Sequence, residues 1–254
     1  MSRLAIDPRL LSWWRPATLR LDIGRSRLLL QDGEKQTRRK LELPLSTGVP
    51  NREQLAMLCH GIEALCAAQP VGRRTLEITV SDALARCWII ERPPGLASLQ
   101  EVEALAADQM QQLYGDSADG PAQWVLRLDV MPFRNKWPAV ALPKTLLELL
   151  QDIAGKHDWR ISKLQTRFVS SINARHDTWF KPAKHAVYSL ETPDGLTIGI
   201  RSAGVWLALR THPPLSLLGG DLSAMLCRDC RVAGISIEDC RIHALRWPLN
   251  RGAA

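Results

Sequence analysis

The stretch from Thr18 to Gln31 constrains the fold more than any other part of this 254-residue chain. Apolar residues alternate through its first half and a run of leucines fills its second half, and such alternation indicates strands. Asp22-Ile23-Gly24, between the two runs, has the residues of a tight turn. We therefore predict a hairpin here, followed by a third strand at 39–45.

The chain then continues in an order that favours a layered α/β fold. Residues 52–68 carry apolar side chains at helical spacing, and residues 73–80 alternate as a strand. Three strands, a helix and a strand that pairs back form one half of such a fold. The next block, residues 84–142, has the order β-α-β-β and is predicted to be an inserted subdomain.

A second, shorter group of elements repeats the first. We expect a first lobe at residues 1–173, a hinge at 174–184 where the periodicity breaks, and a truncated second lobe at 185–254. The second lobe is predicted to contain three strands, a helix at 222–231 and a last strand at 242–247. It is thus a smaller version of the first lobe.

Composition places the chain among soluble globular proteins, with 46% hydrophobic and 23% charged residues. No apolar run reaches the roughly 18 residues that a membrane-spanning helix needs. The N-terminus lacks the apolar core and cleavage site of a signal peptide. We therefore expect a cytoplasmic protein.

This organisation resembles the PilM and GspL family of type IV pilus and type II secretion assembly proteins. The residues that carry the resemblance are Leu21–Gly24, the inserted block 84–142, the re-entry segment 139–144 and Leu217–Leu222. The resemblance implies a two-lobed, degenerate actin-like α/β fold (the ASKHA class, with RNase H-like lobes) that contains an inserted β-α-β-β subdomain. It also implies a non-catalytic scaffold at the inner membrane.

The resemblance further implies a partner. Proteins of this kind take up the short cytoplasmic tail of an inner-membrane assembly protein. By resemblance, the groove for this tail lies between the inserted subdomain and the first lobe. An extended tail can dock there by strand addition.

An actin-like fold raises the possibility of nucleotide binding. In actin-like ATPases the first hairpin cradles a phosphate and its carboxylate acts through a metal ion, so Asp22, Gly24 and Ser26 are the candidate residues. The expected second clamp, at Leu196–Gly204, contains glycines but no carboxylate. ATP hydrolysis needs groups on both sides of the phosphates, so we expect no turnover and no required cofactor. An ATP·Mg²⁺-binding protein is the first alternative.

Four residues near the C-terminus have metal-ligand spacing, and they are Cys227, Cys230, Cys240 and His243. Cysteine and histidine in such a set suit tetrahedral zinc. Against zinc, Cys240 and His243 differ by three positions, which on a strand places them on opposite faces. Packing of the cysteines in the core is the simpler interpretation.

A net charge of +7 leaves a second alternative, a basic nucleic-acid-binding protein. The candidate contacts are Arg38-Arg39-Lys40 and Arg73-Arg74, with Trp13, Trp14 or Trp137 stacking on bases. The basic N-terminal region could instead contact anionic lipid, or the charge could serve solubility alone. Trp13 and Trp14 are either packed on the first sheet or part of an interface. No nucleophile elbow, P-loop, dinucleotide-binding or zinc-protease motif is present.

Overall fold

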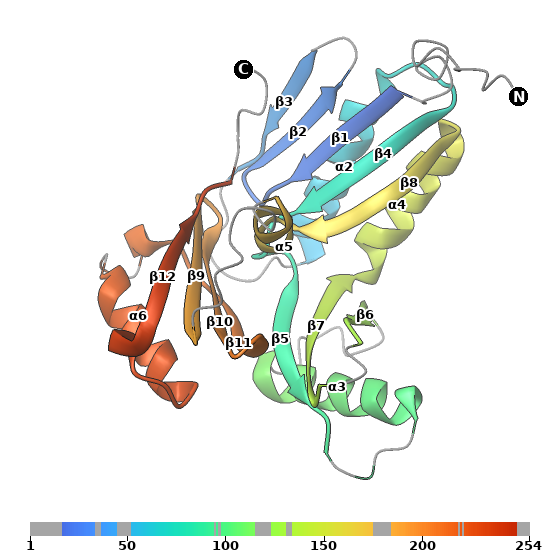
Figure 1. Cartoon of the computed structure of the whole chain (residues 1–254). Coiled ribbons are helices and arrows are strands. Elements are labelled where there is room, and N and C mark those ends of the chain that lie inside the picture. Colours follow the sequence, from blue (N-terminus) through green and yellow to red (C-terminus); the bar gives the residue numbers. More distant parts are fainter. Residues whose placement is uncertain are drawn as a thin grey trace, which may run out of the picture.

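The computed structural model describes residues 17–33, 37–44, 52–93, 95, 98–114, 123–130, 134–174, 184–217, 219 and 221–247. These residues form three sheets and the helices that cover them (Figure 1). The predicted α/β architecture, with two similar lobes and an inserted β-α-β-β unit, is confirmed.

The first lobe is built on a five-stranded sheet of order β3-β2-β1-β4-β8. β1 is central, antiparallel to β2 and parallel to β4, and β8 continues the sheet in parallel. The strands are β1 (Ala17–Ile23), β2 (Arg27–Asp32), β3 (Arg38–Glu42), β4 (Arg74–Val80) and β8 (Trp159–Thr166).

Two helices cover one face of this sheet, and they are α2 (Arg52–Ala67) and α4 (Lys144–Lys156). The core between them contains the alternating residues Leu19, Leu21 and Ile23, which are all almost completely buried. Alternation explains this arrangement, because side chains that differ by two positions share a face. Asp22 consequently points to the opposite face, away from the two helices.

The inserted subdomain is a three-stranded antiparallel sheet of order β5-β7-β6 with one helix packed on it. Its elements are β5 (Arg86–Glu91), α3 (Leu99–Tyr114), β6 (Trp124–Leu128) and β7 (Lys136–Pro143). α3 begins with a capping box, in which Ser98 and Glu101 each accept a hydrogen bond from the other's backbone N–H, both at 3.2 Å.

The second lobe repeats the connection order of the first. Its sheet has the order β11-β10-β9-β12, with β9 antiparallel to β10 and parallel to β12. The same pairings relate β1 to β2 and β4. The elements are β9 (His185–Thr192), β10 (Gly195–Ser202), β11 (Val205–His212), η3 (Leu215–Leu217), α6 (Leu222–Val232), η4 (Ile237–Asp239) and β12 (Cys240–Leu245).

A short helix, α5 (Arg167–Asn173), follows β8 directly and lies where the two lobes meet (Figure 1). Its Phe168 packs against the second sheet so closely that a Cβ on Gly199 would collide with the Phe168 ring. Glycine is required at this position because the helix and the strand approach each other there. This contact fixes the position of α5 between the lobes.

Two local expectations need correction. Asp22 and Ile23 belong to β1, where they pair with Thr79 and Val80 of β4, so the turn begins only at Gly24. The last strand spans Cys240–Leu245, two residues earlier than predicted, because it pairs from Cys240 onward with β9.

Some predictions fall outside the described residues. These are Trp13 and Trp14, the basic segment before residue 17, and residues 175–183 of the expected hinge. None of the described helices is both long and apolar enough to cross a membrane.

Candidate functional site

Two hairpins, one from each lobe, face each other at the junction of the lobes. The first is the β1–β2 hairpin, which contains Asp22, Gly24 and Ser26. The second is the β9–β10 hairpin, whose turn carries Asp194. Because the two lobes have the same strand order, these hairpins occupy equivalent places in the two sheets.

Asp194 corrects the expectation that no carboxylate lies at the second clamp. That expectation placed the second clamp at Leu196–Gly204, which contains the β10–β11 turn. The topology instead places it at the β9–β10 turn, where Asp194 precedes Gly195. The Asp194 side chain is 2% exposed and accepts a hydrogen bond from the Ser26 hydroxyl at 3.3 Å.

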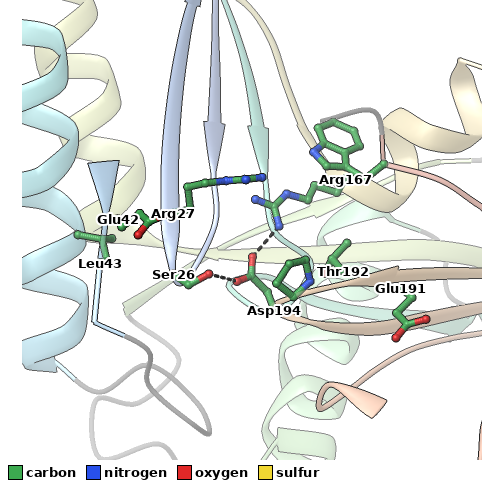
Figure 2. A pocket seen from close by; sticks show the side chains of 10 residues that line it. Ser26, Arg27, Glu42, Leu43, Arg167, Glu191, Thr192 and Asp194 are labelled. Carbon is green, nitrogen blue, oxygen red and sulfur yellow. Dashed lines mark hydrogen bonds and ion pairs between the residues drawn. The ribbon is translucent and has the colours of Figure 1, made fainter. Parts of the chain in front are cut away.

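Arg167, the first residue of α5, binds a carboxylate of each hairpin, and Figure 2 shows its contact with Asp194. Its Nε donates to Oδ1 of Asp22 at 2.9 Å and its Nη2 to Oδ2 of Asp22 at 3.3 Å. Its Nη1 donates to Oδ2 of Asp194 at 2.6 Å. The Arg167 side chain is only 3% exposed, so a buried guanidinium lies between one carboxylate from each lobe.

The electrostatics of this bridge are mutually stabilising. Burial alone would lower the pKa of Arg167, but Asp22 and Asp194 outweigh it and raise that pKa above its usual value. Burial would likewise raise the pKa of Asp194, yet Arg167, the Ser81 hydroxyl and the Arg25 backbone N–H together hold it below its ordinary value. Arg167 and Asp194 are therefore both charged at neutral pH.

Two further contacts support the bridge. The Trp247 indole N–H donates to Oδ2 of Asp22 at 3.2 Å, and the centre of its ring lies 6.0 Å from Cζ of Arg167. Asp82, after β4, accepts the Phe168 backbone N–H at 3.0 and 3.3 Å and thereby holds the start of α5. Burial raises the pKa of Asp82 to about 6, although hydrogen bonds from Thr166 and Phe168 act in the opposite direction.

Gly24 is required by close packing. A Cβ at this position would lie 2.5 Å from Nη2 of Arg167, and 2.8 Å from both Oδ2 of Asp194 and the Arg27 carbonyl oxygen. The space beside the first hairpin, where a phosphate would have to approach the backbone, is thus filled by these two side chains. The residues present here do not fit a magnesium–nucleotide complex, because both carboxylates already bind Arg167.

A pocket of about 350 Å³ opens beside the bridge. Figure 2 shows its walls, which come from the two hairpins, the end of β3, the start of α5 and the segment after β12. Its lining mixes both charges with apolar residues: Ser26, Arg27, Glu42, Leu43, Arg167, Glu191, Thr192, Pro193, Asp194 and Trp247.

The candidate zinc residues do not form one site. Cys230 lies on the buried face of α6 next to Cys240. His243, on the opposite face of β12 from Cys240, stacks on Tyr188 with ring centres 5.0 Å apart. Within the described residues, no group of three or more His, Cys, Asp or Glu side chains is placed to hold a metal ion.

The candidate nucleic-acid-binding residues likewise lie in different parts of the structure. Arg74 donates to Asp32 at 2.9 Å, with side chains only 13% and 2% exposed, so it serves the interior of the first lobe. Arg38, Arg39 and Lys40 lie on the exposed edge strand β3, and Lys40 forms an ion pair with Glu42. Trp137 is buried in the inserted subdomain.

Sequence reasoning missed a second buried carboxylate, Asp229 of α6, which is completely buried. It accepts hydrogen bonds from His212 at 2.7 Å and Arg210 at 3.3 Å. Burial would raise the pKa of Asp229, but these partners and Arg228 hold it below its ordinary value. The sequence signal that could have indicated this carboxylate is an Asp in the middle of an amphipathic helix. This cluster ties α6 to β11.

No protein-family model matches the sequence, and no curated protein matches it. Several solved structures are similar to it in fold. A protein of actin-like ATPase fold and unknown function from Bacteroides thetaiotaomicron aligns with a TM-score of 0.59 at 10% identity, over 92% of this chain and 83% of that one. The PilM–PilN type IV pilus biogenesis complex aligns with a TM-score of 0.50 at 14% identity, over 85% and 70%.

The cytoplasmic domain of EpsL, an inner-membrane component of the type II secretion system of Vibrio cholerae, aligns with a TM-score of 0.42 at 14% identity, over 81% and 75%. The first two likenesses show the fold: the chain has an actin-like α/β fold with two similar lobes. The predicted resemblance to PilM is confirmed at the level of the fold.

Proposed function

We propose that this protein is a non-catalytic scaffold of a type IV pilus or type II secretion-like assembly, on the cytoplasmic side of the inner membrane. The observation that carries the proposal is the Arg167 bridge. A fixed guanidinium lies between Asp22 and Asp194, the two carboxylates that a metal–nucleotide complex would need. The fold shared with the PilM–PilN complex supports the assembly role.

The partner in this proposal is an inner-membrane assembly protein that presents a short cytoplasmic tail. β6 supports this mode of binding because it is an edge of its sheet, and an edge strand offers unpaired backbone groups. Trp124, at the start of β6, pairs with Pro143, where the chain returns to the first lobe. The tail would lie along this edge, between the inserted subdomain and the first lobe.

A crosslinking experiment tests the partner. A photoreactive residue replaces Trp124 in the full chain in its native cells, and a matched variant carries it at Arg160, an exposed position on β8. We expect a crosslink from position 124 to the cytoplasmic tail of a membrane protein, and none from position 160. Equal crosslinking at both positions, or crosslinks to soluble proteins alone, would contradict the proposal.

The proposal that the protein does not bind ATP·Mg²⁺ is tested separately. Titration with ATP·Mg²⁺ should leave the melting temperature of the protein unchanged, since a ligand that does not bind adds no stability. A rise of several degrees that is lost in the Asp22→Ala variant would favour the ATP-binding alternative. Retention on heparin at physiological salt, abolished by neutral substitutions at Arg38 and Arg39, would favour the nucleic-acid alternative.

A further inference from the structure

Two arginines from different parts of the chain meet at the β10–β11 turn. In this turn Ala203 and Gly204 have φ angles of 46° and 81°. A Cβ on Gly204 would lie 3.6 Å from Nη2 of Arg134 and 3.7 Å from Nη2 of Arg201. Both guanidinium groups therefore border the same turn. Arg134 precedes β7 of the inserted subdomain, and Arg201 belongs to β10 of the second lobe.

Both arginines are held by their surroundings. The Arg134 carbonyl oxygen accepts a hydrogen bond from the Trp137 indole at 2.8 Å, which anchors the backbone of this exposed residue. Arg201 follows a register irregularity in β10, and its guanidinium carbon lies 5.9 Å from the centre of the Trp206 ring. A bulge of this kind redirects the side chain that follows it. The turn itself is tied down by the Ala203 N–H, which donates to the Lys184 carbonyl oxygen at 2.8 Å.

No acidic residue of the described chain neutralises this pair. Neither Arg134 nor Arg201 forms an ion pair with a described carboxylate, and Glu91, at the end of β5, forms its ion pair with Lys136 at 3.3 Å. The Nε atom of Arg201 is buried and has no hydrogen-bond partner among the described residues. A buried donor without a partner is unfavourable, and so are two like charges at one turn without a counter-charge.

From these observations we infer that Arg134 and Arg201 form a binding site for an oxyanion, a carboxylate or a phosphate. One oxyanion between the two Nη2 atoms would accept charge-assisted hydrogen bonds from both guanidinium groups and offset their like charges. β11 lies beside β5 and β7 (Figure 1), so the anion would tie the inserted subdomain to the second lobe. This site is separate from the Arg167 bridge and does not depend on the proposed scaffold role.

The source of the oxyanion is resolved by two arms of one experiment. The full-length protein is titrated with inorganic phosphate, or with a blocked tripeptide of glutamates, at constant ionic strength maintained with chloride. The readout is the Nε–Hε signal of Arg201 in a nitrogen–proton correlation spectrum. A saturable shift with phosphate identifies a phosphate site, and one with the peptide identifies a carboxylate site.

Variants make the result specific. Arg134→Gln replaces an exposed side chain and should weaken binding of the anion at least tenfold, since a charge-assisted hydrogen bond is lost. Arg201→Gln should abolish binding, as judged by melting-temperature shifts with the same anions, while Arg160→Gln should bind like the unaltered protein. The inference is overturned if neither anion shifts the Arg201 signal, or if Arg134→Gln binds as tightly as the Arg160→Gln control.

Discussion

Nη1 of Arg167 lies 2.6 Å from Oδ2 of Asp194, and this ion pair joins the helix that follows the first sheet to the first hairpin of the second lobe. The same guanidinium binds Asp22 through two nitrogens. Arg167 is thus a fixed internal cation at the place where two lobes of an actin-like fold meet. It binds one carboxylate from each of the two facing hairpins.

The first prediction concerns the stability that this cation provides. Arg167→Ala leaves Asp22 and Asp194 close together without a counter-charge, in a site where both were nearly excluded from water. Removing one partner of a buried ion pair costs about 3–5 kcal/mol. Urea unfolding should show a loss of this size. Arg160→Ala, at an exposed position, should change the free energy of unfolding by less than about 0.5 kcal/mol.

Much of the fold followed from the sequence because its signals are local. The alternation around Leu21 predicted the central strand, and the helical spacing after residue 52 predicted α2. Each of these patterns is produced by a single face that is buried, so it repeats within a few residues. The inserted subdomain was predicted for the same reason, from a strand, a capped helix and two strands in series.

The site could not be predicted in the same way because its partners are distant in sequence. Arg167 and Asp22 are 145 positions apart, and no local pattern links them. Asp194 was missed for a different reason. The sequence Asp194-Gly195 indicates a turn, but the second clamp was predicted at the following turn, within Leu196–Gly204. Aligning the two β-β-β-α-β series, element by element, would have matched Asp194 with the hairpin after Asp22.

A second prediction uses two glycines in different surroundings. Gly24→Ala introduces a methyl group into occupied space beside Arg167 and Asp194, and overpacking of this kind costs about 1–3 kcal/mol. Gly155, inside α4, has open space where its Cβ would be. Gly155→Ala should stabilise the protein by up to about 1 kcal/mol because alanine favours the helix. Thermal unfolding of both variants checks the opposite signs.

A third prediction concerns metal. Cys240 and His243 lie on opposite faces of β12, so they cannot join Cys227 and Cys230 around one zinc ion. Treatment with a chelator should therefore leave the melting temperature unchanged, whereas a structural zinc domain unfolds when its metal is removed. One equivalent of zinc in the native mass spectrum, lost together with stability on chelation, would contradict this arrangement.

The last prediction concerns the pH dependence that Asp82 creates. Its pKa is about 6 in the folded protein, above the ordinary aspartate value of 3.8, because the carboxyl group is buried. Between these two values the folded state keeps a proton that the unfolded state has lost, so the free energy of unfolding falls as the pH rises from about 4 to about 6. The shift corresponds to roughly 3 kcal/mol.

Asp82→Asn isolates this contribution, because its amide oxygen can still accept the Phe168 N–H but does not titrate. The difference in unfolding free energy between the Asp82→Asn variant and the unaltered protein should therefore change steadily between pH 4 and 6, in favour of the variant at the higher pH. Urea titrations at several pH values measure it. Parallel pH profiles for the two proteins would show that Asp82 titrates normally, and the start of α5 would then not rest on a buried, protonatable group.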